Sequence, residues 1–309
     1  MLGLDQQALP LVRPRLRPPP PRVCVIFATR GRPALLAEAV AEVERQSLRP
    51  RSIIVSCPSR EDAGPAADRP NVTLVTGCHG LAAQRNAGLA LLPPDAEVVV
   101  FFDDDFLPRR NWLAAVAALF AQHADIGAVT GTLIADGIKG PGLTVAAARR
   151  LLAGAPEPVE NAPLRDCYTP YGCNMAFRVS AIVGRRFDER LVLYGWLEDR
   201  DFGAALERRG HRVVKTAAAL GVHLGAKVGR VSGRRLGYSQ VINPLYLFGK
   251  GTMPLRAVAD HLCRNLLSNL VRALAPEPFI DRRGRLRGNL LAFRDLARGI
   301  LQPERAAEL

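Results

Sequence analysis

Three consecutive aspartates, Asp103–Asp105, are the residues of this chain whose types and spacing point most directly to chemistry. They end a run of five apolar residues, Val98–Phe102, that is typical of a buried strand. Carboxylates this close repel one another, so such a cluster usually has a bound cation or a functional reason. What the triplet binds is therefore the first question that the sequence raises.

Three interpretations of the triplet are open from these residues alone. A D-x-D metal site would hold Mg²⁺ or Mn²⁺ through hard carboxylate oxygens and, through the cation, a nucleotide diphosphate. A structural cluster would be neutralised by basic neighbours such as Arg109 and Arg110. Phosphatases of the haloacid-dehalogenase type also end a strand with D-x-D-x-[T/V]. Their motif sits on the first strand, however, and the fifth position here is Leu107.

The elements that must position the triplet alternate along the first half of the chain. Apolar runs with β-branched residues predict strands, and stretches of helical periodicity predict helices between them. The predicted strands are 23–28, 53–56, 72–76, 98–102 and 126–134, and the predicted helices are 33–46, 81–92 and 108–123. Continuously apolar strands of this kind indicate a parallel sheet covered on both faces. Ligands of such sheets bind at the carboxyl ends of the strands, where the triplet lies.

A second pair of candidates, Arg85 and Asn86, falls in the first turns of the helix predicted over 81–92. The start of a helix favours anions, and a guanidinium binds phosphate through a fork of N–H groups. Contact with a diphosphate is one interpretation, and a structural arginine that caps nearby carbonyl groups is the other. Thr29 and Arg30 end the first predicted strand, so we expect them at the same edge of the sheet.

Five segments occur in one order between residues 23 and 225: VIFATRGRP (25–33), GLAAQRNAGLAL (80–91), VVFFDDDFLP (99–108), YGCNMAFR (171–178) and YGWLEDRDFGAALERRGHRV (194–213). In this order they resemble the motifs of inverting family 2 glycosyltransferases with the GT-A fold. The resemblance implies an α/β, Rossmann-like, mostly parallel sheet with helices on both faces. It also implies transfer of a sugar from a nucleotide diphosphate sugar.

The resemblance assigns roles around the triplet. It implies that Asp103 and Asp105 bind Mn²⁺ or Mg²⁺, joined by His223 of GVHLG, while Asp104 faces the ribose. A histidine satisfied within the core is the other interpretation of His223. The residues implied to contact the nucleotide sugar are Thr29, Arg30, Arg85, Asn86, Asp103, Asp104, Asn174 and Trp196. Trp196 could equally be a buried core tryptophan.

The E-D pair of the fifth segment, Glu198 and Asp199, is the catalytic candidate. Inverting transfer needs one carboxylate to take the proton of the acceptor hydroxyl as that oxygen attacks the anomeric carbon. The resemblance gives this role to Asp199. Asp201 is one residue too far along, and we expect it to face solvent.

Two departures from the family pattern bear on how the nucleotide is bound and on how many sugars are added. The second strand often ends in Asp in this family, whereas this chain has Ser56, so Glu61 or Asp62 would have to replace that contact. No Q-x-x-R-W motif follows, which favours a single addition over processive synthesis. We expect UDP as the nucleotide, then dTDP or GDP, and a saccharide or polyprenyl-linked acceptor for surface polysaccharide.

Charge is unevenly distributed along the chain, whose net charge is +13. Residues 206–309 contain 19 Lys/Arg and 7 Asp/Glu, and residues 1–22 contain four arginines and one aspartate. Nucleic acid, anionic lipid and phosphorylated substrates are all partners that basic ends could meet. No basic motif studded with aromatic residues is present, so we do not expect nucleic acid. A nucleic-acid- or membrane-binding protein with an inactive GT-A domain is the alternative function.

The same patterns divide the chain into three parts. Residues 1–22 contain six prolines and no apolar periodicity, which predicts a loosely attached tail. Residues 23–225 form the predicted GT-A domain, and 226–309 a basic, mostly helical extension. A helix predicted over 254–274 has an apolar face that either packs on the GT-A domain or lies on an anionic membrane. The residues of that face are Leu255, Val258, Leu262, Leu266 and Leu270.

The chain contains no apolar stretch that predicts a signal peptide or a membrane span. Its longest later apolar run, Trp112–Ala121, is about half of the roughly twenty residues that a span needs. Six cysteines are scattered without a C-x-x-C pair, which predicts reduced thiols. We therefore expect a cytoplasmic protein, peripheral on the inner face of the plasma membrane if its basic end binds lipid.

Overall fold

The computed structural model describes residues 20–157 and 162–309. Most of the predicted tail, residues 1–19, lies outside the described residues. The sheet begins immediately after it with β1 (Val23–Ala28), which pairs in parallel with β2 (Ser52–Cys57) and β4 (Val98–Asp103). β3 (Val72–Thr76) pairs in parallel with β2. Ala28 lies opposite both Ser56 and Asp103, so the carboxyl ends of three strands form one edge.

The other half of the sheet mixes directions. β8 (Asn174–Arg178) runs antiparallel between β4 and β6 (Ile126–Asp136), and β9 (Arg212–His223) runs parallel to β6. Two short strands, β5 (Phe106–Pro108) and β7 (Arg165–Asp166), pair antiparallel with β9. The described residues thus form a nine-stranded sheet of order β3-β2-β1-β4-β8-β6-β9-β5, with β7 beside β9. The predicted mostly parallel α/β architecture is confirmed.

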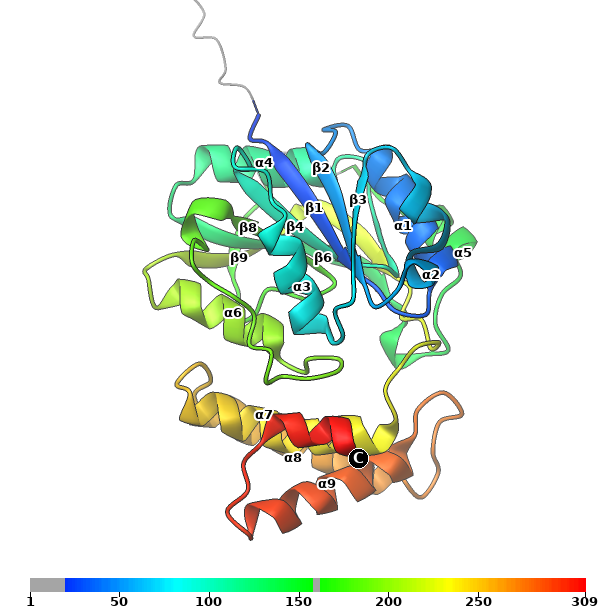
Figure 1. Ribbon diagram of the computed structural model, residues 1–309, viewed down its shortest axis with the longest axis vertical. Coiled ribbons are helices and arrows are strands. Elements are labelled where there is room, and N and C mark those ends of the chain that lie inside the picture. The colour runs from blue at the N-terminus through cyan, green and yellow to red at the C-terminus, as the bar shows by residue number, and fades with distance from the viewer. Residues whose placement is uncertain (1–19, 158–161) are drawn as a thin grey trace, which may run out of the picture.

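Helices cover both faces of this sheet, because alternate residues of its buried strands point to opposite sides. Val25 and Phe27 face the core beneath α1 (Pro33–Glu44) and α4 (Trp112–Gln122). Ile26 faces the opposite core, which contains residues of α3 (Leu81–Ala90) and α6 (Glu198–Glu207). Figure 1 shows α3 in front of the sheet and α4 behind it. Shorter elements are α2 (Arg60–Ala63), η1 (Gly64–Asp68), η2 (Gly137–Lys139), α5 (Val145–Gly154) and η3 (Val179–Ala181).

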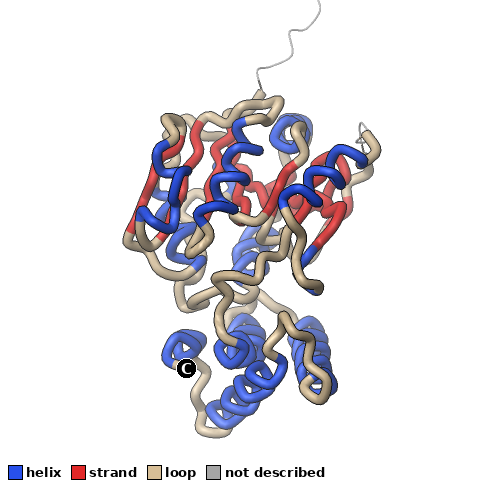
Figure 2. Tube along the Cα trace, turned by 90° about the vertical axis from the view of Figure 1, so that its right-hand side faces the viewer, coloured by secondary structure: helices blue, strands red, loops and turns tan. Residues whose placement is uncertain are grey.

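The chain after β9 forms a separate layer of helices below the sheet in Figures 1 and 2. We call α7 (Gly233–Gly249), α8 (Leu255–Arg272), α9 (Arg282–Leu296) and η4 (Pro303–Glu308) the C-terminal helices. α7 and α9 cross at two glycines: a Cβ on Gly288 would lie 2.0 Å from the Arg234 carbonyl oxygen, and one on Gly237 2.1 Å from that of Arg285. No larger residue fits this crossing without moving the helices apart.

Buried amides connect the three long C-terminal helices. Asn269 Nδ2 of α8 donates to Gln240 Oε1 of α7 and to Asn289 Oδ1 of α9, each at 2.9 Å. Gln240 Nε2 donates back to Asn265 Oδ1 (2.9 Å), and Asn289 Nδ2 donates to the Gly237 carbonyl (2.7 Å). Buried polar groups need such partners, and this network satisfies them.

Apolar and ionic contacts hold the C-terminal helices against the rest of the chain. Leu247, Met253 and Val258 form a small core with Leu191. Lys250 Nζ lies 2.6 Å from Asp188 Oδ2 and 2.7 Å from Asp201 Oδ2. The expectation that Asp201 faces solvent is therefore wrong: the carboxylate is 5% exposed and paired with Lys250.

The apolar face predicted for α8 is only partly correct. Val258 is buried, and Leu262 and Leu266 pack against residues of α7 and α9. Leu255 and Leu270, however, are 62% and 58% exposed, because the face that packs is centred nearer Asn269. Within the described residues, no helix has both the length and the apolar character required to span a bilayer.

Candidate functional site

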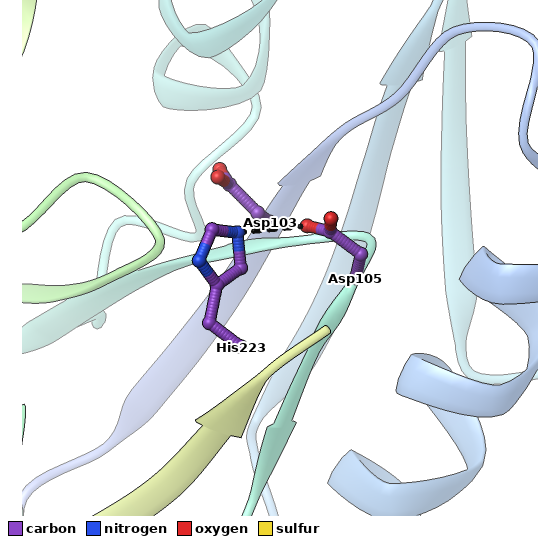
Figure 3. Close-up of side chains that lie close together, drawn as sticks. All are labelled: Asp103, Asp105 and His223. Atoms are coloured by element: carbon purple, nitrogen blue, oxygen red, sulfur yellow. Dashed lines mark ion pairs between the residues drawn. The ribbon is translucent and has the colours of Figure 1, made fainter. Parts of the chain in front are cut away.

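Two carboxylates and a histidine converge at the carboxyl edge of the sheet. Asp103 ends β4, Asp105 lies in the turn that follows, and the antiparallel pairing of β5 with β9 places Phe106 opposite His223. Figure 3 shows His223 and Asp105 turned toward each other, with Asp103 beside them. One ligand atom from each lies within 4.8 Å of the others, and His223 Nε2 is 3.4 Å from Asp105 Oδ1. Residues 120 positions apart in the sequence thus form one cluster.

The imidazole of His223 is oriented by a second carboxylate. Its Nδ1 lies 2.8 Å from Asp136 Oδ1 at the end of β6, and Tyr171 donates its hydroxyl to Asp136 Oδ2 at 3.0 Å. Burial opposes the charged imidazole, but hydrogen bonds to Asp105 and Asp136 raise the pKa of His223 to about 10. A carboxylate behind the distal nitrogen is the usual support of a metal-ligating histidine. Two carboxylate oxygens and an imidazole nitrogen are a donor set that fits Mn²⁺.

Asp104 and Asp105 differ sharply in environment. Asp104 is fully buried and accepts a hydrogen bond from Thr29 Oγ1 at 2.5 Å, and burial raises its pKa to about 7 despite Arg32. Burial opposes the charge of Asp105 too, but His223 and Arg32 outweigh it and lower the pKa of Asp105 to about 2. The repulsion within the triplet is therefore reduced by keeping these two neighbours in different electrostatic surroundings.

Arg32 is the arginine that meets the triplet. Its guanidinium lies 3.0 Å from Asp104 Oδ1 and 3.4 Å from Asp105 Oδ2. Arg109, one of the neighbours expected to neutralise the triplet, pairs instead with Glu157 at 2.7 Å. Arg30, which we expected at the edge of the sheet beside Thr29, is exposed. Arg32 is reached because the turn after Thr29 reverses at Gly31, whose φ is 69°, in the region that favours glycine.

Arg85 joins the triplet to the E-D pair. The guanidinium is 2% exposed and lies 3.2 Å from Asp103 Oδ1, while its other amino group pairs with Glu198 Oε1. It also donates to the Gly172 carbonyl at 2.9 Å. The contact with Gly172 is the carbonyl capping that one interpretation of Arg85 expected, and contact with a diphosphate stays a prediction.

Glu198 and Asp199 begin α6, where backbone N–H groups favour negative charge. Asp199 accepts from the Gly172 N–H at 3.1 Å and from the Arg200 N–H at 2.8 Å, and its side chain is partly exposed. Glu198 is 4% exposed, and burial raises its pKa to about 8 against the effect of Arg85. Burial also raises the pKa of Asp199. Asp199 is thus the less buried of the two residues, and its role as the base stays a prediction.

Two predicted nucleotide contacts have their amides engaged elsewhere. Asn86 donates to Glu189 Oε1 (2.8 Å) and to the Phe187 carbonyl, and it accepts from the Phe187 N–H at 2.8 Å. Asn174 Oδ1 accepts from Thr130 Oγ1 at 2.8 Å and from the Gly131 N–H at 2.9 Å, between β8 and β6. Both amides link separate segments of the backbone, so their predicted contacts with a nucleotide stay predictions.

Trp196 lies where the C-terminal helices meet the sheet domain. Its ring is edge-on to His261 of α8, with centroids 6.4 Å apart, and its carbonyl accepts from Asn243 Nδ2 of α7 at 2.9 Å. The indole Nε1 is buried without a hydrogen-bond partner among the described residues. Its predicted contact with a sugar stays a prediction.

Several residues of the site were missed from the sequence: Arg32, Gln84, Asp136 and Tyr171. Gln84 Nε2 donates to the carbonyls of Thr29 (2.7 Å) and Ser56 (3.0 Å), which ties the ends of β1 and β2. Asp136 follows the apolar run of β6 as Asp103 follows that of β4, so the same signal would have found it. Asp62, a proposed substitute for an Asp at Ser56, accepts from the Gly31 N–H at 2.6 Å.

The family of the chain follows from the part that builds most of this edge. The model of the family described as "Glycosyl transferase family 2" matches residues 24–183, from β1 through the triplet to η3. The chain belongs to glycosyl transferase family 2. Glu198, Asp199 and His223 of this family 2 chain lie beyond the matched range. No curated protein matches it significantly.

Solved structures similar to this family 2 chain include a mannosyltransferase from Pyrobaculum calidifontis, PcManGT, in complex with GDP-Man and Mn²⁺. It is 20% identical, with a TM-score of 0.55 over 93% of this chain and 82% of that one. S. aureus TarS 1-349, in complex with UDP-GlcNAc, is 15% identical, with a TM-score of 0.55 over 92% and 82% of the two chains. At these identities the likeness establishes the fold, and the GT-A expectation is confirmed.

Proposed function

We propose that this protein transfers one sugar from a nucleotide diphosphate sugar to a hydroxyl of a saccharide or lipid-linked saccharide, with inversion at the anomeric carbon. The observation that carries the proposal is the bridge formed by Arg85 between the Asp103 side of the metal-type cluster and the E-D pair. A donor held at the metal-type cluster would have its sugar close to Glu198 and Asp199. Residues 23–225 carry this chemistry in our proposal, and 226–309 are an extension.

Asp199 is the proposed base. Its carboxylate takes the proton of the acceptor hydroxyl as that oxygen bonds to the anomeric carbon, and the bond from that carbon to the diphosphate oxygen breaks. Thr29 and Arg32 hold the carboxylate of Asp104 in place beside the donor. Asp103, Asp105 and His223 would bind Mn²⁺ or Mg²⁺, which when bound offsets the charge of the departing diphosphate.

The neighbours in complex with GDP-Man and with UDP-GlcNAc support a nucleotide diphosphate sugar without deciding between the bases. We propose UDP first, then dTDP or GDP. A hexosyl donor, an acceptor for surface polysaccharide and a cytoplasmic site of action complete the proposal. Asn86 and Asn174, whose amides are already bonded, would act by holding the backbone around the donor.

The test is thermal stabilisation of the full chain by nucleotides, with and without Mn²⁺. UDP at a hundred times its Kd should stabilise the protein by about 2.7 kcal/mol when Mn²⁺ is present, and far less after chelation. Asp105→Asn should lose this Mn²⁺ dependence, while Asp68→Asn, an exposed carboxylate on η1, should keep it. UDP binding that ignores the chelator would contradict the metal-type site, and failure of every nucleotide sugar to transfer would contradict the proposed function.

A further inference from the structure

α8 presents an apolar stripe to solvent after its other side has packed. The stripe is defined by Leu267, Leu270 and Val271 in the last turns of α8 and by Leu274 just beyond its end, which are 57–86% exposed. The opposite side of α8 is used within the molecule, through Val258 in one core and Asn269 in the amide network. Single exposed leucines are ordinary, but a row of them along one helix marks an interaction surface.

α9 carries the matching charge. Arg283, Arg287 and Arg294 of α9 and Arg298 just beyond its end are spaced by four or seven residues and are all exposed, so they share the outer side of the helix. Among the described residues, no carboxylate lies within 4 Å of Arg283, Arg287 or Arg298. Leu290 (63% exposed) and Phe293 (43%) stand beside them. Residues 226–309 contain fifteen Lys/Arg and six Asp/Glu, a net charge of +9.

α9 lies farther from the sheet than α7, which contacts the sheet domain directly. α7, the start of α8 and η4 contact the rest of the chain, through Asn243 with Trp196, Val258 with Leu191 and Glu304 with Arg190. Figures 1 and 2 show α9 at the end of the molecule away from the sheet, with α8 beside it. β1 runs toward this layer, so its carboxyl end lies on the side of the sheet domain that the C-terminal helices face.

We propose that the outer face of α8 and α9 docks on an anionic lipid membrane. An interfacial helix places aliphatic side chains in the boundary of the acyl chains while basic side chains reach the headgroup phosphates. The stripe on α8 supplies the aliphatic side chains, and the arginines of α9 supply the basic ones. A guanidinium can bind two phosphate oxygens at once. A nucleic acid would use the arginines but gain nothing from four exposed aliphatic side chains. Only the purpose of docking, which is to bring the site to a lipid-linked acceptor, rests on the proposed function.

The test is sedimentation of the full chain with vesicles of phosphatidylcholine, alone or mixed with phosphatidylglycerol. We expect binding only to the mixed vesicles, and release at high salt because screening shortens the reach of the arginines. Arg287→Ala with Arg298→Ala should lower the partition coefficient about thirtyfold, roughly fivefold for each basic residue. Leu267→Gln with Leu274→Gln should lower it at least tenfold. The leucine substitutions leave the net charge unchanged, so their effect distinguishes insertion of apolar side chains from electrostatic attraction to the vesicle.

Matched controls lie on the sheet domain. Val183→Gln replaces an equally exposed aliphatic side chain, and Arg49→Glu an exposed arginine, so neither should alter vesicle binding. Unchanged melting temperatures in all variants would show that the fold is intact. Four results would overturn the proposal. Two concern vesicles: equal binding to neutral vesicles, or no binding to either kind. The other two are concentration-dependent dimers that Leu267→Gln with Leu274→Gln abolishes, and tight binding of nucleic acid in place of vesicles. Sugar transfer to a water-soluble acceptor should be unchanged in these variants, so its loss would bear on the proposed function alone.

Discussion

At the carboxyl edge of the sheet, charges of opposite sign are packed against one another, whereas on α9 charges of one sign stand in solvent. Arg85 is 2% exposed between Asp103 and Glu198, and Arg32 meets Asp104 and Asp105. Arg287 has no carboxylate within 4 Å among the residues that the structure describes. Buried charge must be compensated inside the protein, while exposed charge is compensated by water and by partners.

This difference separates what the two regions can do. At the site, each charge sets the protonation and position of another, so a single change should disturb chemistry or folding. On the outer face of α8 and α9, the same kind of change should disturb association alone. Four substitutions can break or sharpen this comparison.

The largest effect is expected at Asp199. Asp199→Asn keeps the shape of the side chain but removes the basic carboxylate, so the initial rate of sugar transfer should fall by about 10²–10⁴. Stabilisation by UDP with Mn²⁺ should stay near that of the unmodified protein, because we propose that the donor's phosphates bind at the other cluster. Asp68→Asn, an exposed carboxylate on η1, is the matched control. Loss of donor binding in Asp199→Asn would instead assign Asp199 to the donor pocket.

The next effect concerns stability. Arg85→Met leaves Glu198 and Asp103 buried or half-buried without their cation, which should lower the free energy of unfolding by about 3–5 kcal/mol. Urea denaturation measures this. Adding Glu198→Gln should recover part of the loss, because the carboxylate left unpaired is then removed. A single variant that unfolds at the same urea concentration as the unmodified protein would contradict the idea that Arg85 carries the charge balance of the site.

A smaller effect is expected at Gly172. A Cβ there would lie 3.3 Å from Asp199 Oδ2 and 3.4 Å from Glu198 Oε1, so both carboxylates would have to shift by a few tenths of an ångström. Gly172→Ala should slow transfer roughly tenfold with donor affinity retained, since catalysis is sensitive to small misplacement. Gly154→Ala, where a Cβ meets nothing within 4 Å, should leave the rate unchanged. Equal rates for both variants would show that the geometry around Asp199 tolerates displacement.

The smallest effect is expected at Arg287. Arg287→Ala should change the free energy of unfolding by no more than about 0.5 kcal/mol, because the side chain is exposed and unpaired by carboxylates within the described residues. Measured beside Arg85→Met in the same denaturant series, it compares one arginine from each region. A loss similar to that of Arg85→Met would mean that α9 uses Arg287 to fold, and would remove it from the docking surface.

The sequence was sufficient where the signal is local. The apolar runs of β1 to β4 and the position of the triplet followed from composition and strand length, and the structure bears them out. Asp103, Asp105 and His223 were named together because of a family resemblance, and the fold brings them within 4.8 Å. Their role as metal ligands stays a prediction.

What could not be predicted depends on tertiary contacts. Arg30 and Arg32 are two residues apart in one turn, and only the reversal at Gly31 decides that Arg32 meets the aspartates. We expected Asp201 to be exposed because its partner, Lys250, follows α7 and is 49 residues away in the sequence. The packed side of α8 was misplaced because polar residues, Asn265 and Asn269, occupy it where an apolar pattern predicts leucine.

Those amides determine which way α8 faces. A helix held only by leucines can rotate or slide by a turn and find similar contacts, but a buried amide that loses its partner costs about 1–3 kcal/mol. Asn269 meets both Gln240 and Asn289, so any slip of α8 would strand several amides at once. The network therefore favours one packed orientation of α8, and Leu267 and Leu274 face outward because Asn265 and Asn269 on the opposite side bond to Gln240 of α7 and Asn289 of α9.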